Sequence, residues 1–382
     1  MDQASQNKPW DLLVFIGRFQ PLHQGHLHIV SEALQQTKHL LILIGSSNRS
    51  RSVKNPFTFN EREQLFKTAV ANELANDSLQ RITFSPLADT LYNDRLWQAA
   101  TLEEIDKVKR LTHAEDDRVA VVGYDKDESS YYLSCFPQLG FVAISNYKNL
   151  SATPFRESYL RLDSKNSPES LKREHDVFPA ATCKFLEDFK RSEAYESLVA
   201  EQEYVDHYRH IWRDAPYPPV FVTVDALVRF RNECLFIRRG NAPAKGLLAM
   251  PGGFLDPDER AFDGAVRELR EETALGVSYD ALHRSLVSHQ FFDHPSRSVR
   301  KRTVTQAFYF DLSELVDKRP IVSAQDDAAD VCWLDVSELE SQPNTLSSTQ
   351  LKTIQPESFA EDHFFMLAAF LFNWPAINPT QN

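Results

Sequence analysis

Two groups of residues have the types and spacing that chemistry requires. The first is the string Gly17-Arg18-Phe19-Gln20-Pro21-Leu22-His23-Gln24-Gly25-His26, which follows an apolar run. His23 and His26 bracket a glycine at the start of an expected helix, and a helix N-terminus favours phosphate. Two imidazoles there can donate hydrogen bonds to a phosphoryl group in transfer, while Arg18 supplies a permanent positive charge. This string therefore indicates chemistry at a phosphate.

The second group is acidic and lies in the other half of the chain. Glu268, Glu271 and Glu272 are spaced i, i+3 and i+4, so a helix would place all three carboxylates on one face. Adjacent carboxylates raise one another's pKa unless cations neutralise them. Arg267 is an internal partner, and hard oxygen ligands favour Mg²⁺, with Mn²⁺ as the alternative. The plain alternative is the acidic, solvent-exposed face of an ordinary helix.

The first half of the chain alternates short apolar runs with amphipathic stretches, which predicts an α/β domain with a doubly wound parallel sheet. The loop after Ile16 then lies at the carboxyl end of a strand, where such sheets bind ligands. The expected strands are Leu12–Ile16, Leu40–Ile44, Arg81–Phe84, Val119–Val122 and Phe141–Ile144, and the expected helices are His26–Gln36, Asn60–Asn72 and Leu96–Arg110.

The second half has an α+β pattern. A helical connector, Thr182–Arg213, ends at a proline-rich breaker. We therefore divide the chain into domains at 1–181 and 216–382, with residues 182–215 between them. The expected strands are Val220–Phe230, Cys234–Arg238, Leu286–Phe292 and Thr303–Phe310, and the expected helices are Ala261–Thr273 and Ser358–Leu371.

Composition narrows the class of protein. The 382 residues carry 42 Lys and Arg against 54 Asp and Glu, and neither half has the basic stripe of a nucleic-acid binder. The longest apolar runs are too short to span a membrane or to form a secretion signal. The four cysteines lie far apart, which favours a reduced, cytoplasmic setting. Aromatic residues on the connector helix could form an interface between subunits, so an oligomer is possible.

The histidine string resembles the signature of the nucleotidyltransferase superfamily, in the form of the archaeal-type nicotinamide mononucleotide (NMN) adenylyltransferases. Ser151-Ala152-Thr153-Pro154-Phe155-Arg156 resembles the family's SxTxxR element, although a plain helix N-cap would explain its hydroxyls alone. The resemblance implies transfer of the adenylyl group of ATP to NMN, giving NAD and pyrophosphate with Mg²⁺. It implies catalytic roles for His23, His26, Arg18 and Arg156, and ATP binding by Gly17, Phe19, Gly25, Gly123, Asp125, Ser151 and Thr153.

An aromatic residue stacks on the nicotinamide ring in that family, which makes Trp97 and Asn93 the expected NMN-binding residues. An indole face suits a cationic pyridinium. The alternative is that Trp97 lies in the core on the apolar side of its helix. Transfer to another acceptor, as in flavin, pantetheine or cytidylyl transferases, is the other open alternative for this domain.

The glutamate group resembles the Nudix box, GX5EX7REUXEEXGU, with one departure: Ala274 replaces a glycine that usually leaves the helix in a left-handed conformation. Gly276 is a candidate for that role. The resemblance implies metal ligation by Glu268 and Glu272, a ligand or water-activating role for Glu271, and hydrolysis of a diphosphate. The matched box residues are Gly253, Glu259, Arg267, Glu268, Glu271 and Glu272.

Substrate choice lies outside the box. Arg297 and Arg300, in a turn, are a candidate clamp for phosphate or ribose, with an ordinary surface loop as the alternative. Asp326 and Asp327 could supply a base. The whole chain resembles bifunctional NMN adenylyltransferase–Nudix hydrolases, and analogy suggests that ADP-ribose is cleaved to AMP and ribose 5-phosphate. A ligand sensor is the non-enzyme alternative, opposed by the intact carboxylates and the lack of a basic recognition helix.

Overall fold

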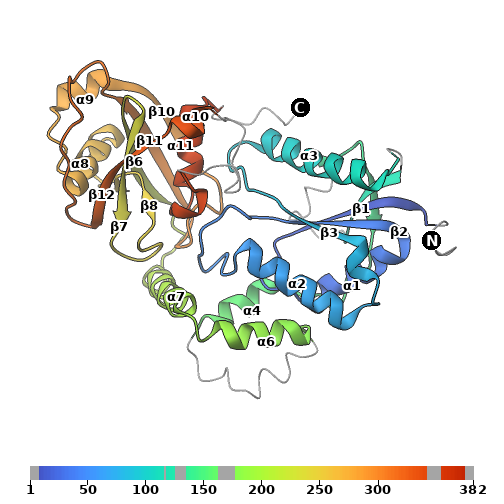
Figure 1. Cartoon of the computed structure of the whole chain (residues 1–382). Coiled ribbons are helices and arrows are strands. Elements are labelled where there is room, and N and C mark those ends of the chain that lie inside the picture. Colours follow the sequence, from blue (N-terminus) through green and yellow to red (C-terminus); the bar gives the residue numbers. More distant parts are fainter. Residues whose placement is uncertain (1–7, 116–117, 125–134, 162–176, 342–353, 375–382) are drawn as a thin grey trace. The chain divides into compact units, whose positions relative to one another are not determined.

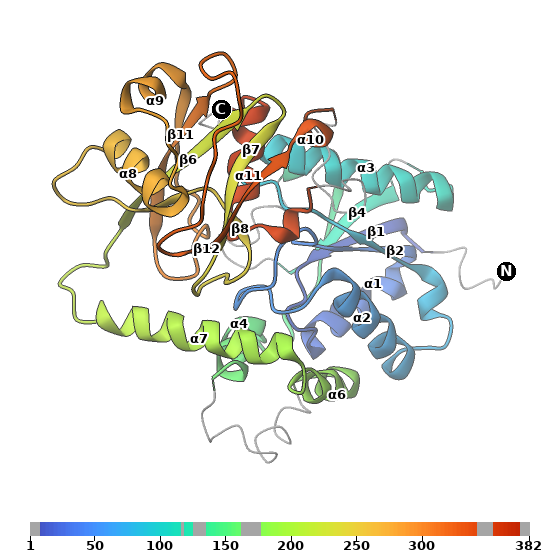
Figure 2. The same ribbon diagram turned by 60° about the vertical axis from the view of Figure 1, so that its left-hand side comes forward.

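The computed structural model describes residues 8–115, 118–124, 135–161, 177–341 and 354–374. The chain folds as two compact units, which Figures 1 and 2 show from two directions. The first comprises Met1–Asp89 and Arg95–Val199, and the second comprises Thr90–Asp94 and Ala200–Asn382. Among the residues described, no helix has the length and apolar character needed to cross a membrane.

The first unit is built on a five-stranded sheet in the order β3-β2-β1-β4-β5, in which every neighbouring pair is parallel. The prediction of a parallel α/β sheet is confirmed. Its strands are β1 (Trp10–Gly17), β2 (Thr37–Ile44), β3 (Ile82–Pro86), β4 (Val119–Gly123) and β5 (Gly140–Ala143), and its helices include α1 (Gln24–Gln36), α2 (Phe59–Glu73), α3 (Asp94–Thr112) and α4 (Ala152–Tyr159).

Helices cover both faces of this sheet, so its central strands β1 and β4 are buried almost throughout, whereas the edge strand β5 alternates. Leu13 and Phe15 of β1 pack in one core with α1 and α2, whereas Leu12 and Val14 pack in a second core with α3. Figure 1 shows α3 on the opposite side of the sheet from α1 and α2. The carboxyl end of β1 therefore opens into a loop held between two packed layers.

The expected single helix Thr182–Arg213 is wrong in one respect. The structure has two helices, α6 (Ala180–Phe189) and α7 (Glu193–Ile211). The Ser192 hydroxyl donates to the carbonyl of Phe189 and accepts from the amide of Tyr195. The serine thus ends one helix and begins the next, and the change from the first unit to the second falls within α7.

The second unit contains a mixed seven-stranded sheet, which confirms an α/β fold overall. Its main path runs β10-β11-β6-β7-β12, with β8 beside β7 and β9 beside β6. The strands are β6 (Phe221–Phe230), β7 (Glu233–Arg239), β8 (Leu248–Ala249), β9 (Gly252–Phe254), β10 (Leu286–Phe292), β11 (Thr303–Asp311) and β12 (Ala328–Asp335).

Helices lie on both sides of this second sheet. Figures 1 and 2 show α8 (Ala261–Thr273) and α9 (Tyr279–Ser285) on one side and α11 (His363–Leu371) on the other. Neighbouring residues of β11 serve opposite faces: Phe308 packs in the core with α8, while Tyr309 contacts Phe370 of α11. The expected helix Ser358–Leu371 is instead a short 3₁₀ turn, Pro356–Ser358, followed by α11, and α10 (Ser337–Ser341) was not expected.

Candidate active sites

The loop after β1 brings the histidine string into a compact arrangement. Phe19 adopts a left-handed backbone conformation (φ 51°), and its ring lies over Gly17. A Cβ atom at Gly17 would lie 2.7 Å from that ring, so only glycine fits there. Gly25 similarly packs against the His23 ring, 3.1 Å from where its own Cβ would stand. The side chains that contact these glycines thus leave no room for a Cβ atom at Gly17 and little room at Gly25.

The two histidines form one unit at the start of α1. Their rings stack with centroids 3.5 Å apart, and the His23 backbone N–H donates to His26 Nδ1 over 3.1 Å. Because Nδ1 of His26 accepts, its neutral ring carries the proton on Nε2. Nε2 is therefore a hydrogen-bond donor, as transfer of a phosphoryl group requires.

Two arginines, Arg18 and Arg156, belong to the same site. Arg156 is buried, and its guanidinium donates to the carbonyls of Val53 (3.2 Å) and Gln20 (3.0 Å) and to the Thr153 hydroxyl (3.4 Å). Burial, together with the charge of exposed Arg18, lowers the pKa of Arg156 to about 10. Closely spaced cations favour an anionic ligand, and Arg18 is the member of the group that is open to one.

The other residues expected to bind nucleotide lie on several elements. Ser151 occupies the N-cap position of α4, although its side chain makes no capping hydrogen bond. Gly123 ends β4, while Asp125 lies outside the described residues. Trp97 is half-buried on α3 and contacts Phe136 at 5.8 Å between centroids, so part of its ring serves the core. Asn93 lies in a turn within the segment that folds with the second unit.

Helix α8 and the turn before it carry the acidic group of the second unit, with Glu259 in the turn. Arg267 binds three of its carboxylates, those of Glu259 (2.7 Å), Glu268 (2.9 Å) and Glu271 (2.9 Å). The Glu268 carboxylate also packs on Gly253, where a Cβ atom would lie 2.6 Å from its Cδ. The glycine of the box thus leaves space for a glutamate.

Glu272 has a different environment from the other three glutamates. It is 4% exposed and accepts a hydrogen bond from the Gly252 N–H at 2.9 Å. Burial, and then the Glu268 carboxylate, raise the pKa of Glu272 to about 8. Burial also raises the pKa of Glu268.

These raised pKa values bear on metal binding. The described residues contain no preformed group of three metal-binding side chains. Two partly desolvated carboxylates nevertheless form an oxygen donor set whose negative charge a divalent cation would stabilise. The residues therefore fit such a cation, with Glu268 and Glu272 as the groups that would hold it.

The end of α8 explains the departure from the box. Ala274 itself takes the left-handed conformation, with φ 50° and ψ 29°, and its N–H bonds to the carbonyl of Arg270. Gly276 is not in the left-handed region and has open space around it. The suggestion that Gly276 assumes the role of the missing glycine is therefore wrong.

The left-handed Ala274 leads to a stability prediction. Ala274→Gly should stabilise the second unit by about 0.5–1 kcal/mol, because glycine has no steric penalty at positive φ. The measurement is the urea midpoint of the full-length protein. Gly276→Ala is the matched control and should not destabilise the fold. A loss of stability in that control would show that the turn after α8 depends on Gly276.

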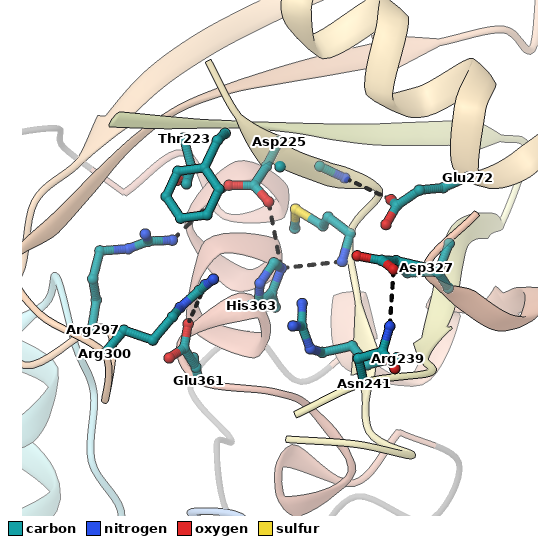
Figure 3. Close-up of a pocket in the computed structure, with 15 residues that line it drawn as sticks. Thr223, Asp225, Arg239, Asn241, Glu272, Arg297, Arg300, Asp327, Glu361 and His363 are labelled. Carbon is teal, nitrogen blue, oxygen red and sulfur yellow. Dashed lines mark hydrogen bonds and ion pairs between the residues drawn. The ribbon is translucent and has the colours of Figure 1, made fainter. Parts of the chain in front are cut away.

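A pocket in the second unit extends from Glu272 to the predicted arginines (Figure 3). In this view Glu272 and Asp327 lie on one side of it, with Arg297 and Arg300 on the other. Arg300 approaches Glu361 at 4.0 Å and lies over the Phe254 ring at 5.3 Å. The pocket therefore places carboxylates and arginines where a diphosphate and its sugar could lie between them.

Arg297 differs from the expected open clamp. It is 4% exposed, and its Nε and Nη2 donate to the Asp362 carboxylate at 3.0 and 3.2 Å. Tyr92 donates to the same carboxylate at 2.6 Å. Arg297 lines the pocket, but its bidentate partner is a protein carboxylate, which leaves Arg300 as the better candidate for direct substrate contact.

Several pocket residues have no motif in the sequence. Asp225 lies in β6 and accepts from the Thr305 hydroxyl at 2.5 Å. His363 begins α11, and its Nδ1 accepts from the Met250 N–H at 3.1 Å. Burial lowers the pKa of His363, so it is neutral. The one available signal was the placement of polar residues inside otherwise apolar segments. The remaining lining residues without a predicted role include Thr223, Arg239, Asn241 and Glu361.

Comparisons with known proteins match both units of the chain. The family described as Cytidylyltransferase-like matches residues 14–156, and the NUDIX domain family matches residues 219–355. A crystal structure of a bifunctional NMN adenylyltransferase/ADP ribose pyrophosphatase from Francisella tularensis, in complex with AMP and a Mn ion, is 34% identical to this chain. It covers 96% of this chain and 100% of its own, with a TM-score of 0.81.

Relatives of the first unit alone are also similar. The nicotinamide/nicotinic acid mononucleotide adenylyltransferase of Acinetobacter baylyi is 39% identical over 199 residues, which are 51% of this chain and 94% of that protein. The nicotinamide-nucleotide adenylyltransferase of Archaeoglobus fulgidus is 42% identical over 88 residues, which span 49% of that protein.

The fold and the two sites thus define a two-domain nucleotide enzyme. The chain belongs to the bifunctional NMN adenylyltransferase/Nudix hydrolase family. It therefore contains an adenylyltransferase domain and a Nudix hydrolase domain, and such domains generally use divalent metals.

Proposed function

We propose that the first domain transfers the adenylyl group of ATP to NMN, giving NAD and pyrophosphate. An NMN phosphate oxygen bonds to the α-phosphorus as the bond to the departing pyrophosphate oxygen breaks. The observation that carries this proposal is the His23–His26 unit, whose tautomer makes His26 Nε2 a donor for the charge that develops. Arg18 adds positive charge beside it, and Mg²⁺ accompanies the triphosphate.

For the second domain we propose Mg²⁺-dependent hydrolysis of ADP-ribose to AMP and ribose 5-phosphate. The name of the Francisella relative, which covers nearly the whole chain, supports this substrate. When bound, a divalent cation would neutralise the diphosphate and help to ionise water. Glu268 and Glu272 would hold it, Glu271 is our candidate for water activation, and Arg300 is our candidate for substrate binding.

A product-mass assay on the full-length protein tests both proposals. NMN and nicotinate mononucleotide should yield dinucleotides with ATP, whereas flavin and pantetheine phosphates should not. A panel of nucleotide diphosphates with Mg²⁺ or Mn²⁺ should show ADP-ribose cleaved fastest. If another diphosphate is cleaved faster, that compound replaces ADP-ribose as the proposed substrate. If no diphosphate is cleaved, the result favours the alternative that the second domain is a ligand sensor.

The setting proposed from the sequence is cytoplasmic. All four cysteines, Cys135, Cys183, Cys234 and Cys332, are free thiols, which supports a reducing compartment.

A further inference from the structure

Arg62 is a buried cation with an unusual set of partners. It lies on α2, is 2% exposed, and donates to four backbone carbonyls. Its Nη1 reaches the carbonyls of Arg18 (2.8 Å) and Gly45 (2.6 Å), its Nη2 that of Ser46 (3.2 Å), and its Nε that of Thr58 (3.1 Å). Among the described residues no carboxylate forms an ion pair with it, although the charge of Asp89 lies near enough to favour the cation. A buried charge whose hydrogen bonds all go to backbone carbonyls needs an explanation beyond packing.

The position of these carbonyls supplies that explanation. Arg18 follows β1 directly and begins the loop that leads to His23 and His26, whereas Gly45 follows β2. The two strand ends are also joined directly, because the Gly45 N–H donates to the Gly17 carbonyl at 2.8 Å. One guanidinium therefore fixes both strand ends from which the nucleotide-binding loops depart.

A second buried side chain extends the same framework. The Gln20 amide bonds to both backbone groups of Phe57, at 2.9 and 3.0 Å, and so ties the histidine loop to the start of α2. The Thr58–Glu61 capping box fixes that start of the helix. Arg62 thus connects a rigid helix to the loop whose geometry adenylyl transfer requires.

We propose that Arg62 is a positioning residue for adenylyl transfer. It acts through the backbone of Arg18 and Gly45, and so holds the histidine loop in the arrangement that stabilises the transition state. This inference rests on the proposed function of the first domain. Burial lowers the pKa of Arg62 to about 10, so its guanidinium keeps its charge at neutral pH.

The chain contains a matched control for this clamp. Arg81 also donates to three backbone carbonyls, those of Leu34 (2.6 Å), Thr37 (2.5 Å) and Lys38 (3.2 Å). These carbonyls surround the beginning of β2, at the opposite end of the strand from Gly45. Arg81→Lys therefore removes a similar set of arginine–carbonyl hydrogen bonds, at a less buried position, from the same sheet without disturbing the histidine loop.

The test compares Arg62→Lys with Arg81→Lys in the full-length protein, by steady-state kinetics with ATP and NMN and by thermal melting. Arg62→Lys keeps the charge but loses the planar guanidinium that binds several carbonyls at once. We therefore expect kcat to fall on the order of 100-fold with a much smaller change in KM. Arg81→Lys should keep kcat. Arg62→Met, which lacks the charge as well, should be slower than Arg62→Lys.

Three results would overturn the proposal: unchanged kcat in Arg62→Lys, equal losses of kcat in both lysine variants, or a loss confined to KM. If Arg62→Lys does not fold, Arg62→Gln is measured below its melting temperature by the same criteria. Failure of the proposed function looks different, because wild type would then form no dinucleotide from NMN. The comparison would in that case use whichever acceptor wild type adenylylates.

Discussion

Replacement of His26 by alanine is expected to lower kcat for adenylyl transfer by about 10²–10³-fold, with KM for ATP and NMN changed only a few-fold. The reason is the tautomer: His26 Nδ1 accepts from the His23 N–H, so Nε2 is a donor for a phosphoryl oxygen. A donor aimed at developing charge stabilises the transition state more than the bound substrate. Initial rates of dinucleotide formation at varied ATP and NMN measure both constants.

His28 provides the control for this change. It lies two residues further along α1, and its ring contacts Tyr147 at 5.2 Å between centroids rather than the His23–His26 unit. His28→Ala should therefore keep kcat close to that of wild type. A near-normal kcat for His26→Ala, in protein with the melting temperature of wild type, would show that His26 does not stabilise the transition state.

The second large effect is expected at Glu272, where replacement by glutamine should reduce diphosphate hydrolysis on the order of 10³-fold or more. A metal ligand contributes several kcal/mol of charge stabilisation to the transition state, and glutamine cannot supply the charge. Hydrolysis rates across a range of Mg²⁺ and Mn²⁺ concentrations measure the loss. Adenylyl transfer by the same sample should be unaffected.

The same substitution should not weaken the metal-free fold. The pKa of Glu272 is raised to about 8, so its folded carboxyl binds a proton between about pH 4.5 and 8 that the unfolded chain releases. Stability is therefore lost as pH rises through this window, and neutral glutamine avoids that loss. At pH 9 Glu272→Gln should melt no lower than wild type.

Glu314→Gln is the matched change at an exposed residue outside the pocket, and it should keep full hydrolysis. Hydrolysis by Glu272→Gln at the wild-type rate would contradict the assignment of Glu272 as a metal ligand. A low melting temperature in that variant would instead show that the carboxylate serves the fold.

Local patterns predicted the elements more accurately than their connections. Short apolar runs identified all five strands of the first sheet, most clearly β1 and β4, which are buried on both faces. The expected connector helix failed because apolar residues recur at helical spacing on each side of the break, as Phe185 and Phe189 and as Tyr195 and Leu198, and the six-residue step between the two pairs was taken as part of one helix. The signal for that break is Ser192, a hydroxyl before the acidic first turn of α7.

The residues of the two sites likewise fall into those that a local motif predicts and those that only the folded structure reveals. Both motifs are continuous in sequence, so their residues could be named before the structure was known. Asp225, Glu361 and His363 belong to the same pocket but come from β6 and from the region where α11 begins. Only the pairing and packing of distant segments brings them together, and a single sequence contains no direct signal of that packing. Ala274 shows a milder limit, since the motif implied glycine where alanine accepts the strain.

The pairing of β6 with β11 also bears on the order in which the second unit can fold. These strands are parallel neighbours from Phe221↔Thr303 to Arg229↔Asp311, and α8 lies between them in sequence. The apolar face of α8, including Val266 and Leu269, packs in a core that β11 helps to form. A chain growing from its N-terminus can pack that face against β6, but the core remains incomplete until residue 311 has been made. The core beneath the hydrolase centre is consequently completed late in synthesis, and a chain stalled before β11 should leave part of the apolar surface of α8 uncovered.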